Sequence, residues 1–270
     1  MGIENLFHGA LKRNERGYWE TQGSEPISYT KNGHDIILNY EDNSFWYKHR
    51  NECIKSLLKT NKVLNILDVG GGNGYVSHMI QQMGVRVTLL EPGTSGVLNA
   101  LNRGVIEVIK GTPKTLGMRV GSFEAIGLFD VLEHIENEDE FLQSLNCGLK
   151  NQGKLFITVP AHQYLWSNFD VEVGHFRRYN LLSLVSKLEE NGFYVIYKSY
   201  FFSLLLIPLY MLRKVFKINK SRMNRKKEHI GASNIIGRLV GVVLIFEKWF
   251  ISRQIKLPFG TSCIVVAVKK

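Results

Sequence analysis

The feature that most constrains the fold of this chain is an apolar run that ends in a cluster of glycines. Residues 63–69 are mostly apolar, residues 70–74 contain four glycines, and residues 75–83 have the pattern of a helix. This order predicts a buried strand, a tight turn and the N-terminus of a helix. Because glycine has no Cβ, the backbone N–H groups of such a turn can approach a ligand closely. The turn therefore predicts a site for a nucleotide-like cofactor.

Strands and helices alternate along most of the chain. Strands are predicted at 63–69, 86–91, 105–109, 125–129, 154–159, 194–201 and 262–268. Helices are predicted at 44–60, 75–83, 94–102, 138–149 and 181–191. Helices between successive strands indicate a parallel sheet that is covered on both faces. The expected fold is α/β, with a Rossmann-like, mostly parallel sheet of seven strands and helices on both faces.

The same pattern divides the chain into three regions. Residues 1–43 are polar and irregular, and we expect them to form an extension or a lid. Residues 44–202 together with 261–270 carry the strands and helices of the expected cofactor-binding domain. Residues 203–260 separate the last two strands and form the expected helical insertion.

The positive charge of the chain is concentrated in this insertion. Residues 203–260 contain 12 Lys and Arg but only 2 Asp and Glu, whereas the rest of the chain is balanced. Two apolar segments, 201–216 and 235–251, predict helices with basic flanks, which suit an anionic membrane surface. A helical cap or a dimer interface is the alternative. Few aromatic residues lie among the Lys and Arg, so nucleic acid is a less favoured partner. The sequence leaves the oligomeric state open.

Cysteine use and hydropathy give an expected location. Cys53, Cys147 and Cys263 are far apart and lack metal-ligand spacing, which indicates reduced thiols in a cytoplasmic protein. The first 16 residues have no long apolar core, and no uninterrupted apolar run reaches the roughly 18 residues of a spanning helix. We expect a cytoplasmic protein that can contact a membrane through residues 203–260.

The spacing of the glycines separates the cofactor classes. A dinucleotide fingerprint requires a glycine where this chain has Tyr75, and no Gly-Lys-Ser/Thr follows for a P-loop. Residues 66–74, Ile-Leu-Asp-Val-Gly-Gly-Gly-Asn-Gly, resemble instead the first motif of class I S-adenosylmethionine-dependent methyltransferases. The resemblance continues with Glu91 at the end of the second strand and with the blocks 129–135 and 149–155, in the family's order.

This resemblance implies a set of cofactor contacts. Glu91 would accept hydrogen bonds from both ribose hydroxyls, which suits a carboxylate. Asp68 would orient the glycine turn and reach the cofactor's amino group. Thr112 stands where the family often has an acidic residue, so a hydroxyl would replace that contact with the adenine. The implied cofactor-binding residues are Arg50, Asp68, Gly70, Gly72, Asn73, Gly74, Glu91, Pro92, Thr112 and Phe129.

The chemistry is expected where loops leave the fourth and fifth strands, because crevices of such sheets lie there. Glu133 and His134 follow the fourth strand, and His175 lies in the long loop after the fifth. These three are the candidate catalytic residues, with His134 or His175 as the general base. The candidates for acceptor binding come from the same loop and are His162, Trp166, Arg177, Arg178 and Tyr179.

Residues 159–167 and 174–179 narrow the resemblance. They are similar to bacterial methyltransferases that often accompany glycan or lipid biosynthesis and, more distantly, to ubiquinone-pathway O-methyltransferases. This implies methylation, favoured on oxygen, of a small-molecule or lipid-linked acceptor that is glycan-like or quinone-like. One alternative is a Mg²⁺-dependent RNA 2′-O-methyltransferase, whose metal ligands would be Asp130, Glu133, His134 and His175; we favour a site without metal. A non-catalytic protein that binds S-adenosylmethionine is the other alternative.

Overall fold

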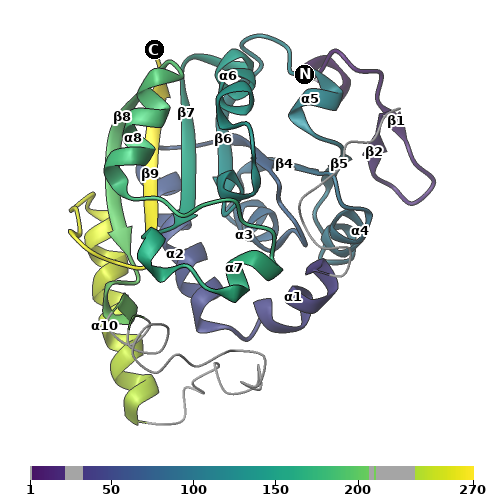
Figure 1. Ribbon diagram of the computed structural model, residues 1–270. Helices are drawn as coiled ribbons and strands as arrows, with labels where there is room; N and C mark the ends of the chain where they lie inside the picture. Colours follow the sequence, from purple (N-terminus) through teal and green to yellow (C-terminus); the bar gives the residue numbers. More distant parts are fainter. Residues whose placement is uncertain (1, 22–32, 207–209, 211–234) are drawn as a thin grey trace.

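A computed structural model describes residues 2–21, 33–206, 210 and 235–270 of the chain (Figure 1). In this part, nine strands form one sheet in the order β1-β2-β5-β4-β3-β6-β7-β9-β8. The strands are β1 (Lys12–Arg13), β2 (Trp19–Glu20), β3 (Asn65–Val69), β4 (Arg86–Glu91), β5 (Glu107–Lys110), β6 (Phe123–Phe129), β7 (Leu149–Pro160), β8 (Phe193–Phe201) and β9 (Ser262–Lys269).

Helices cover both faces of this sheet (Figure 1). The α-helices are α1 (Gly33–Glu41), α2 (Phe45–Thr60), α3 (Tyr75–Gln82), α4 (Thr94–Asn102), α5 (Pro113–Leu116), α6 (Glu138–Gly148), α7 (Asn168–Glu172), α8 (Leu181–Glu190) and α10 (Ile235–Ser252). Short 3₁₀ helices lie at η1 (Ile3–Leu6), η2 (Leu132–His134), η3 (Gln163–Leu165) and η4 (Ser203–Leu205). The α/β fold expected from the sequence is confirmed.

The strand count is a correction, because seven strands were expected. The two additional strands, β1 and β2, come from residues 1–43, which were expected to be irregular. Each is two residues long, too short for an alternating pattern to be recognised in a sequence. β2 pairs in parallel with β5 and so extends one edge of the sheet.

The two largest apolar cores lie on opposite faces of the sheet. α2, α3 and α10 pack on one face, where Ile54, Ile80 and Ile251 are buried together. α6 and α8 pack on the other face through Leu145 and Leu188. Side chains of alternate residues on the buried strands enter the two cores, as the strand period of two requires.

The strand order indicates which end of the sheet is expected to bind a ligand. β3, β4 and β5 run outward to one side, and the chain then returns to place β6 beside β3. The connections after β3 and after β6 lead to opposite sides of the sheet. Crevices for ligands form at the carboxyl ends of the strands where the strand order reverses in this way. The glycine turn leaves β3 here, and α1 and α7 lie at the same edge (Figure 1).

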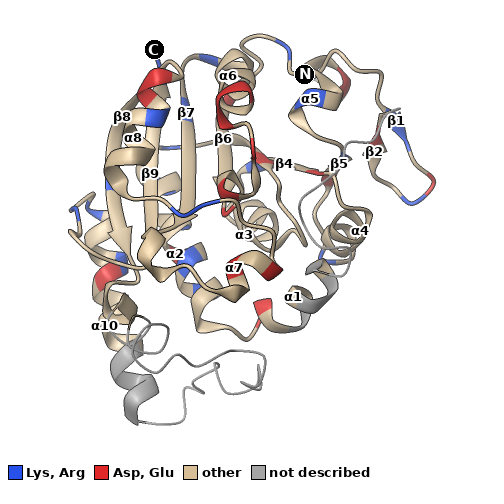
Figure 2. Cartoon of the chain, viewed as in Figure 1, with Lys and Arg blue, Asp and Glu red and all other residues tan. Residues whose placement is uncertain are grey.

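The insertion contributes η4 and α10 to the described part of the chain. α10 covers the second apolar segment, whereas most of the first, 201–216, lies outside the described residues. Over the described sheet and its helices, basic and acidic residues are interspersed along the chain (Figure 2). No helix in the described ranges is long and apolar enough to cross a membrane.

Candidate cofactor and active site

The glycine turn after β3 depends on backbone angles that favour glycine. Gly70, Gly72 and Gly74 have φ angles of 70°, 53° and 75°, a region that side chains with a Cβ rarely adopt. A Cβ on Gly74 would lie 2.8 Å from the Cβ of Ala100 on α4. Gly74 therefore permits close packing of α3 against α4. A glycine is not needed for this packing at position 75, where the chain has Tyr75.

Glu91 ends β4 and binds the glycine turn directly. Its Oε2 accepts a hydrogen bond from the backbone N–H of Gly72 at 3.0 Å, and its Oε1 accepts one from Gly93 at 2.6 Å. The side chain is buried. The two predicted cofactor motifs, the glycine turn and the acidic end of the second parallel strand, are thus in contact. Pro92 follows Glu91 directly in this loop.

Helix α1 lies against this loop, in the region predicted to be a lid. His34 Nε2 is 3.4 Å from Glu91 Oε1, and the His34 carbonyl accepts a hydrogen bond from Asn73 Nδ2 at 2.8 Å. Arg103 holds the end of α1, with ion pairs of 3.0 Å to Glu41 and 2.6 Å to Asp42. The sequence reasoning missed these residues of α1, since no local pattern links residues 33–42 to the glycine turn.

Asp68 lies inside the protein below the turn. It is buried, and Ser77 Oγ donates a hydrogen bond of 2.6 Å to its Oδ2. Burial raises the pKa of Asp68 to about 7, because the charged form loses its hydration. Asp68 can therefore exchange a proton near neutral pH when a cation binds beside it.

Arg50 lies at the carboxyl end of β6 and not on the glycine turn. Its Nη1 is 2.6 Å from Asp130 Oδ2, and Thr158 Oγ1 donates to Asp130 Oδ1 at 2.9 Å. Arg50 is buried, so this ion pair fixes α2 to the strand ends.

The last two cofactor candidates are held within the protein. Phe129, the last residue of β6, packs into the core beside α2. Thr112 caps α5, where its Oγ1 accepts a hydrogen bond from Thr115 N at 3.1 Å.

The three candidate catalytic residues come together. η2 follows β6 and presents Glu133 and His134, and His175 follows α7. The rings of His134 and His175 are 4.6 Å apart in a T-shaped arrangement, and His175 Nε2 is 3.9 Å from Glu133 Oε1. The geometry thus supports a shared site for residues that are 41 positions apart along the chain.

Burial sets the protonation of two of these groups. Glu133 is fully enclosed, and burial together with the nearby Asp130 raises its pKa well above the ordinary value. Burial, with a further contribution from His175, lowers the pKa of His134 to about 4. His134 is therefore neutral at physiological pH, and its Nδ1 lies 3.2 Å from the carbonyl oxygen of Gly174. A carbonyl only accepts hydrogen bonds, which assigns the ring proton to Nδ1.

Asp170 orients His175, and the sequence reasoning did not select it. Asp170 Oδ1 is 3.0 Å from His175 Nδ1, and Ser167 donates to Oδ2 from its backbone N and its Oγ. Arg178 adds an ion pair of 2.6 Å. Burial alone would raise the pKa of Asp170, but the bonds from His175 and Arg178 outweigh it and lower that pKa. The ionised carboxylate accepts from Nδ1, which leaves Nε2 of His175 on the side of Glu133.

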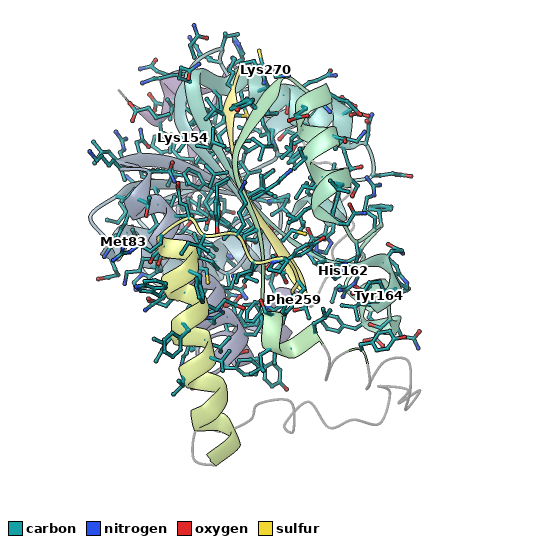
Figure 3. All side chains as sticks on the ribbon, turned by 90° about the vertical axis from the view of Figure 1, so that its left-hand side faces the viewer. Met83, Lys154, His162, Tyr164, Phe259 and Lys270 are labelled. Carbon is teal, nitrogen blue, oxygen red and sulfur yellow. The ribbon has the colours of Figure 1, made fainter. Side chains whose placement is uncertain are left out.

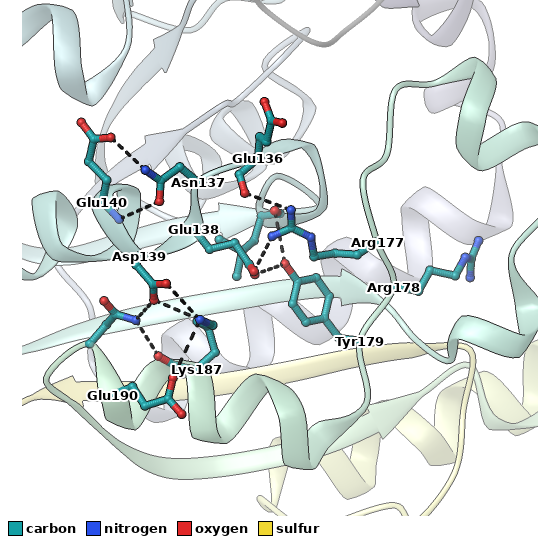
Figure 4. Close-up of polar contacts among 12 residues, drawn as sticks. Glu136, Asn137, Glu138, Asp139, Glu140, Arg177, Arg178, Tyr179, Lys187 and Glu190 are labelled. Carbon is teal, nitrogen blue, oxygen red and sulfur yellow. Dashed lines mark hydrogen bonds and ion pairs between the residues drawn. The ribbon is translucent and has the colours of Figure 1, made fainter.

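Two of the candidate acceptor-binding residues are bound to the first turn of α6. Arg177 forms an ion pair with Glu138 and donates to the carbonyl of Glu136 at 3.0 Å. The hydroxyl of Tyr179 donates to the same Glu138 carboxylate. Figure 4 shows both side chains converging on Glu138, whereas Arg178 extends away from this group. The Arg178 guanidinium pairs instead with Asp170. All three residues hold the loop in place through these contacts.

The other two candidates lie near the start of the loop. The ring of His162 stacks on Tyr164 and Tyr200, with centroid distances of 4.8 and 5.0 Å. His162 has a φ of 63°, and burial lowers its pKa. Trp166 is half-buried and follows η3. His162 and Tyr164 therefore form an aromatic group with Tyr200 of β8.

The proposed metal ligands are only partly assembled. Glu133, His134 and His175 offer ligand atoms that all lie within 4.8 Å of one another. Asp130, the fourth residue of the set, has its carboxylate bound to Arg50 and Thr158 instead. Two imidazoles and one carboxylate could hold a divalent cation, but the oxygen-rich set that Mg²⁺ prefers is not formed.

Comparison with curated proteins gives methyltransferases. Over 173 residues, the chain is 21% identical to a probable S-adenosylmethionine-dependent methyltransferase of Mycobacterium tuberculosis, covering 63% of each protein. It is 28% identical over 99 residues to a ubiquinone biosynthesis O-methyltransferase of Xanthomonas axonopodis, covering 34% of this chain and 41% of that protein. The chain thus covers less than two thirds of the length of these relatives.

Solved structures of methyltransferases share the fold. A putative methyltransferase of Haloferax volcanii, in complex with the activator Trm112, has a TM-score of 0.60 at 13% identity, covering 91% of this chain and 99% of that one. Phosphoethanolamine N-methyltransferase 2 of Haemonchus contortus has a TM-score of 0.58 at 16% identity, covering 90% and 58%. At these identities the likeness shows a shared fold.

The family follows from a match that includes the glycine turn, Glu91 and the catalytic candidates after β6. The family model described as a methyltransferase domain matches residues 45–198, which is more than half of the chain. This chain therefore belongs to the methyltransferase domain family, as a class I member by its fold.

Proposed function

We propose that this protein transfers a methyl group from S-adenosylmethionine to an oxygen of a small or lipid-linked acceptor. The observation that carries the proposal is the Asp170–His175 pair at the edge of the sheet where the glycine turn and Glu91 also lie. A cofactor site and an oriented imidazole at one edge suit a methyl transfer that removes a proton. The ubiquinone biosynthesis O-methyltransferases among the relatives favour oxygen and a quinone-like acceptor. A glycan-like acceptor rests on the resemblance of residues 159–167 and 174–179 alone.

The proposed cofactor site uses the residues around the glycine turn. Gly70, Gly72 and Gly74 give the backbone a close approach to the methionine part. Glu91 would accept hydrogen bonds from the ribose hydroxyls, and Asp68 would face the cationic amino group. When bound, the sulfonium of the cofactor supplies an electrophilic methyl group.

The proposed role of His175 is that of general base. Asp170 holds the proton on Nδ1, so the lone pair of Nε2 can take the proton of the acceptor hydroxyl. The acceptor oxygen forms a bond to the methyl carbon while the carbon–sulfur bond breaks, and S-adenosylhomocysteine leaves. His175 then holds the proton, and the ionised Asp170 stabilises the resulting imidazolium.

Calorimetry with S-adenosylmethionine and with NAD tests the cofactor. We expect binding of the former and none of NAD. Mass spectrometry of small-molecule and lipid extracts incubated with the protein and methyl-labelled cofactor then identifies the acceptor. With that acceptor, His175→Ala should lower kcat by a factor of about 100 or more and leave the cofactor affinity unchanged. Binding of NAD alone, or full turnover by the variant, would overturn the proposal.

A second candidate is a metal-dependent methyltransferase, which the grouping of Glu133, His134 and His175 favours. A cation there would lower the pKa of an acceptor hydroxyl and replace the general base. Turnover after dialysis against a chelator separates the two mechanisms. Activity that is lost and then restored by Mg²⁺ or Mn²⁺ would support this candidate over the first. Methylation of RNA by the restored protein would identify it with the RNA 2′-O-methyltransferase alternative.

A further inference from the structure

The inner face of α10 is polar at its centre. Leu244, Glu247 and Ile251 are buried, and their spacing puts them on one side of the helix. Glu247 Oε1 is 2.7 Å from His49 Nε2 on α2 and accepts a hydrogen bond from Phe202 N at 2.7 Å. The helix is therefore docked on α2 by a buried carboxylate as well as by apolar contacts.

The outer face of α10 is apolar, which reverses the usual arrangement of a surface helix. Val242, Ile245, Phe246 and Trp249 follow the spacing of the opposite side of the helix, and all four are exposed. The exposed fractions of Phe246 and Trp249 are 58% and 47%. Figures 1 and 3 show α10 at the edge of the molecule, projecting past the end of the sheet. A contiguous apolar surface of this kind marks an interaction site.

Positive charge accompanies this apolar face. The Arg253 guanidinium lies 5.4 Å from the centroid of the Trp249 ring, and Lys256 is exposed shortly after the helix. The segment that contains the helix, residues 203–260, has 12 basic and 2 acidic residues. A tryptophan beside cationic side chains is typical of a protein that lies at the boundary between water and lipid headgroups.

We infer that the outer face of α10, defined by Val242, Ile245, Phe246 and Trp249, docks on the surface of an anionic phospholipid bilayer. The helix lies in the plane of the headgroups, with its apolar side chains below them and Arg253 and Lys256 among the phosphates. It does not cross the bilayer, because no helix in the described ranges is suited to that. The methyl transfer proposed above does not depend on this docking.

Charge argues against a second copy of the chain as the occupant of this face. A symmetric contact through α10 would bring Arg253 beside Trp249 in one copy toward the same residues of the other, and like charges repel. Anionic lipid neutralises that charge. The lipid surface therefore accommodates both the apolar face of α10 and the cationic side chains of Arg253 and Lys256.

Vesicle flotation tests this inference on the full chain. The probe is a vesicle of phosphatidylcholine with an equal part of anionic phosphatidylglycerol, beside a vesicle of phosphatidylcholine alone. We expect the wild-type protein to float with the mixed vesicles at low salt and to be released at high salt, because salt screens the charge. The double variant F246S/W249S should lower the partition coefficient by a factor of about 10 or more, since two large apolar side chains are lost.

The matched control is the double variant I106S/L182S. Ile106 and Leu182 are exposed apolar residues outside α10, so this variant should float like the wild type. Calorimetric affinity for S-adenosylmethionine reports folding in both variants. The inference is overturned if the wild type does not float, or if F246S/W249S floats as well as the control. It is also overturned if light scattering shows a dimer that only F246S/W249S dissociates.

Discussion

His34 Nε2 lies 3.4 Å from Glu91 Oε1, and both side chains are buried. The Glu91 carboxylate also accepts hydrogen bonds from the backbone of Gly72 and Gly93. Ribose hydroxyls that bind Glu91 must therefore replace the contact with His34 or share it. Because His34 belongs to α1, we expect entry of the proposed cofactor to be coupled to the position of this helix.

The first prediction concerns Glu91. In Glu91→Gln, one carboxylate oxygen becomes an NH₂ group, which cannot accept from a backbone N–H or a ribose hydroxyl. Hydrogen bonds to charged groups contribute about 1.5–3 kcal/mol, so we expect the affinity for S-adenosylmethionine to fall about 10-fold to 100-fold. Calorimetry measures it.

Glu107→Gln is the control for this variant. Glu107 lies on the neighbouring strand β5, and its carboxylate binds Arg86 and Thr88 instead of the glycine turn. Its replacement should leave the cofactor affinity within about twofold of wild type. An equal loss in both variants would show that the effect of Glu91 is general and does not come from ribose binding.

The second prediction is a pH dependence of cofactor affinity. Burial raises the pKa of Asp68 to about 7 in the free protein. Below this pH the carboxyl group is neutral, and above it the carboxylate attracts the cationic amino group of the cofactor. The affinity should therefore rise about fivefold to tenfold between about pH 6 and about pH 7.5, with release of a proton.

Asp68→Asn isolates this effect. An asparagine keeps an oxygen acceptor for Ser77 Oγ, which donates to Asp68 in the wild type, but it does not ionise. The variant should bind weakly at both pH values, with a flat profile. A variant that keeps the wild-type slope would assign the proton to another group.

The third prediction uses two glycines with nearly the same backbone angle. Gly74 and Gly84 have φ angles of 75° and 76°. A Cβ on Gly74 would clash with Ala100 and Val105 at 2.8 and 2.9 Å, whereas a Cβ on Gly84 would have no atom within 4 Å. Gly84→Ala should lower the free energy of unfolding by about 1–2 kcal/mol, from the left-handed backbone alone.

Gly74→Ala should cost about 1–3 kcal/mol more than this, because overpacking adds to the backbone strain. Urea denaturation at equal m-value measures both variants. Equal losses at Gly74 and Gly84 would mean that α3 and α4 adjust to the added methyl group, and that close packing is not why a glycine stands at position 74.

The elements that the sequence predicted well are those whose signals are local. The turn at 70–74 and Glu91 are each encoded by a strand and the residues directly after it, so their contact follows from the parallel pairing of β3 and β4. His34 lies in a region with no periodic pattern, and its position depends on contacts of α1 with α4 and the turn. Local sequence patterns therefore could not predict that His34 contacts Glu91.

Charged residues in the long loop show the same limit. The sequence offers Arg177 as a residue for acceptor binding, but it does not show which distant carboxylate the guanidinium will meet. Its partner Glu138 lies 39 positions earlier, at the start of α6. Asp170 was overlooked for a related reason, since the importance of its carboxylate appears only when α7 brings it to His175.

The fourth prediction concerns the attachment of α10. The Glu247 carboxylate binds His49 Nε2 and the backbone N–H groups of Phe202 and Ser203. Glu247→Ala leaves these buried groups without an acceptor, which should lower the free energy of unfolding by about 2–4 kcal/mol. Urea denaturation measures it.

The control Glu52→Ala removes an exposed partner of Lys248 on the same α2–α10 contact and should change stability by less than about 0.5 kcal/mol. Because the proposed cofactor site lies at the ends of β3 and β4, both variants should keep their affinity for S-adenosylmethionine. A small effect of Glu247→Ala on unfolding would mean that the apolar contacts of Leu244 and Ile251 alone hold the helix.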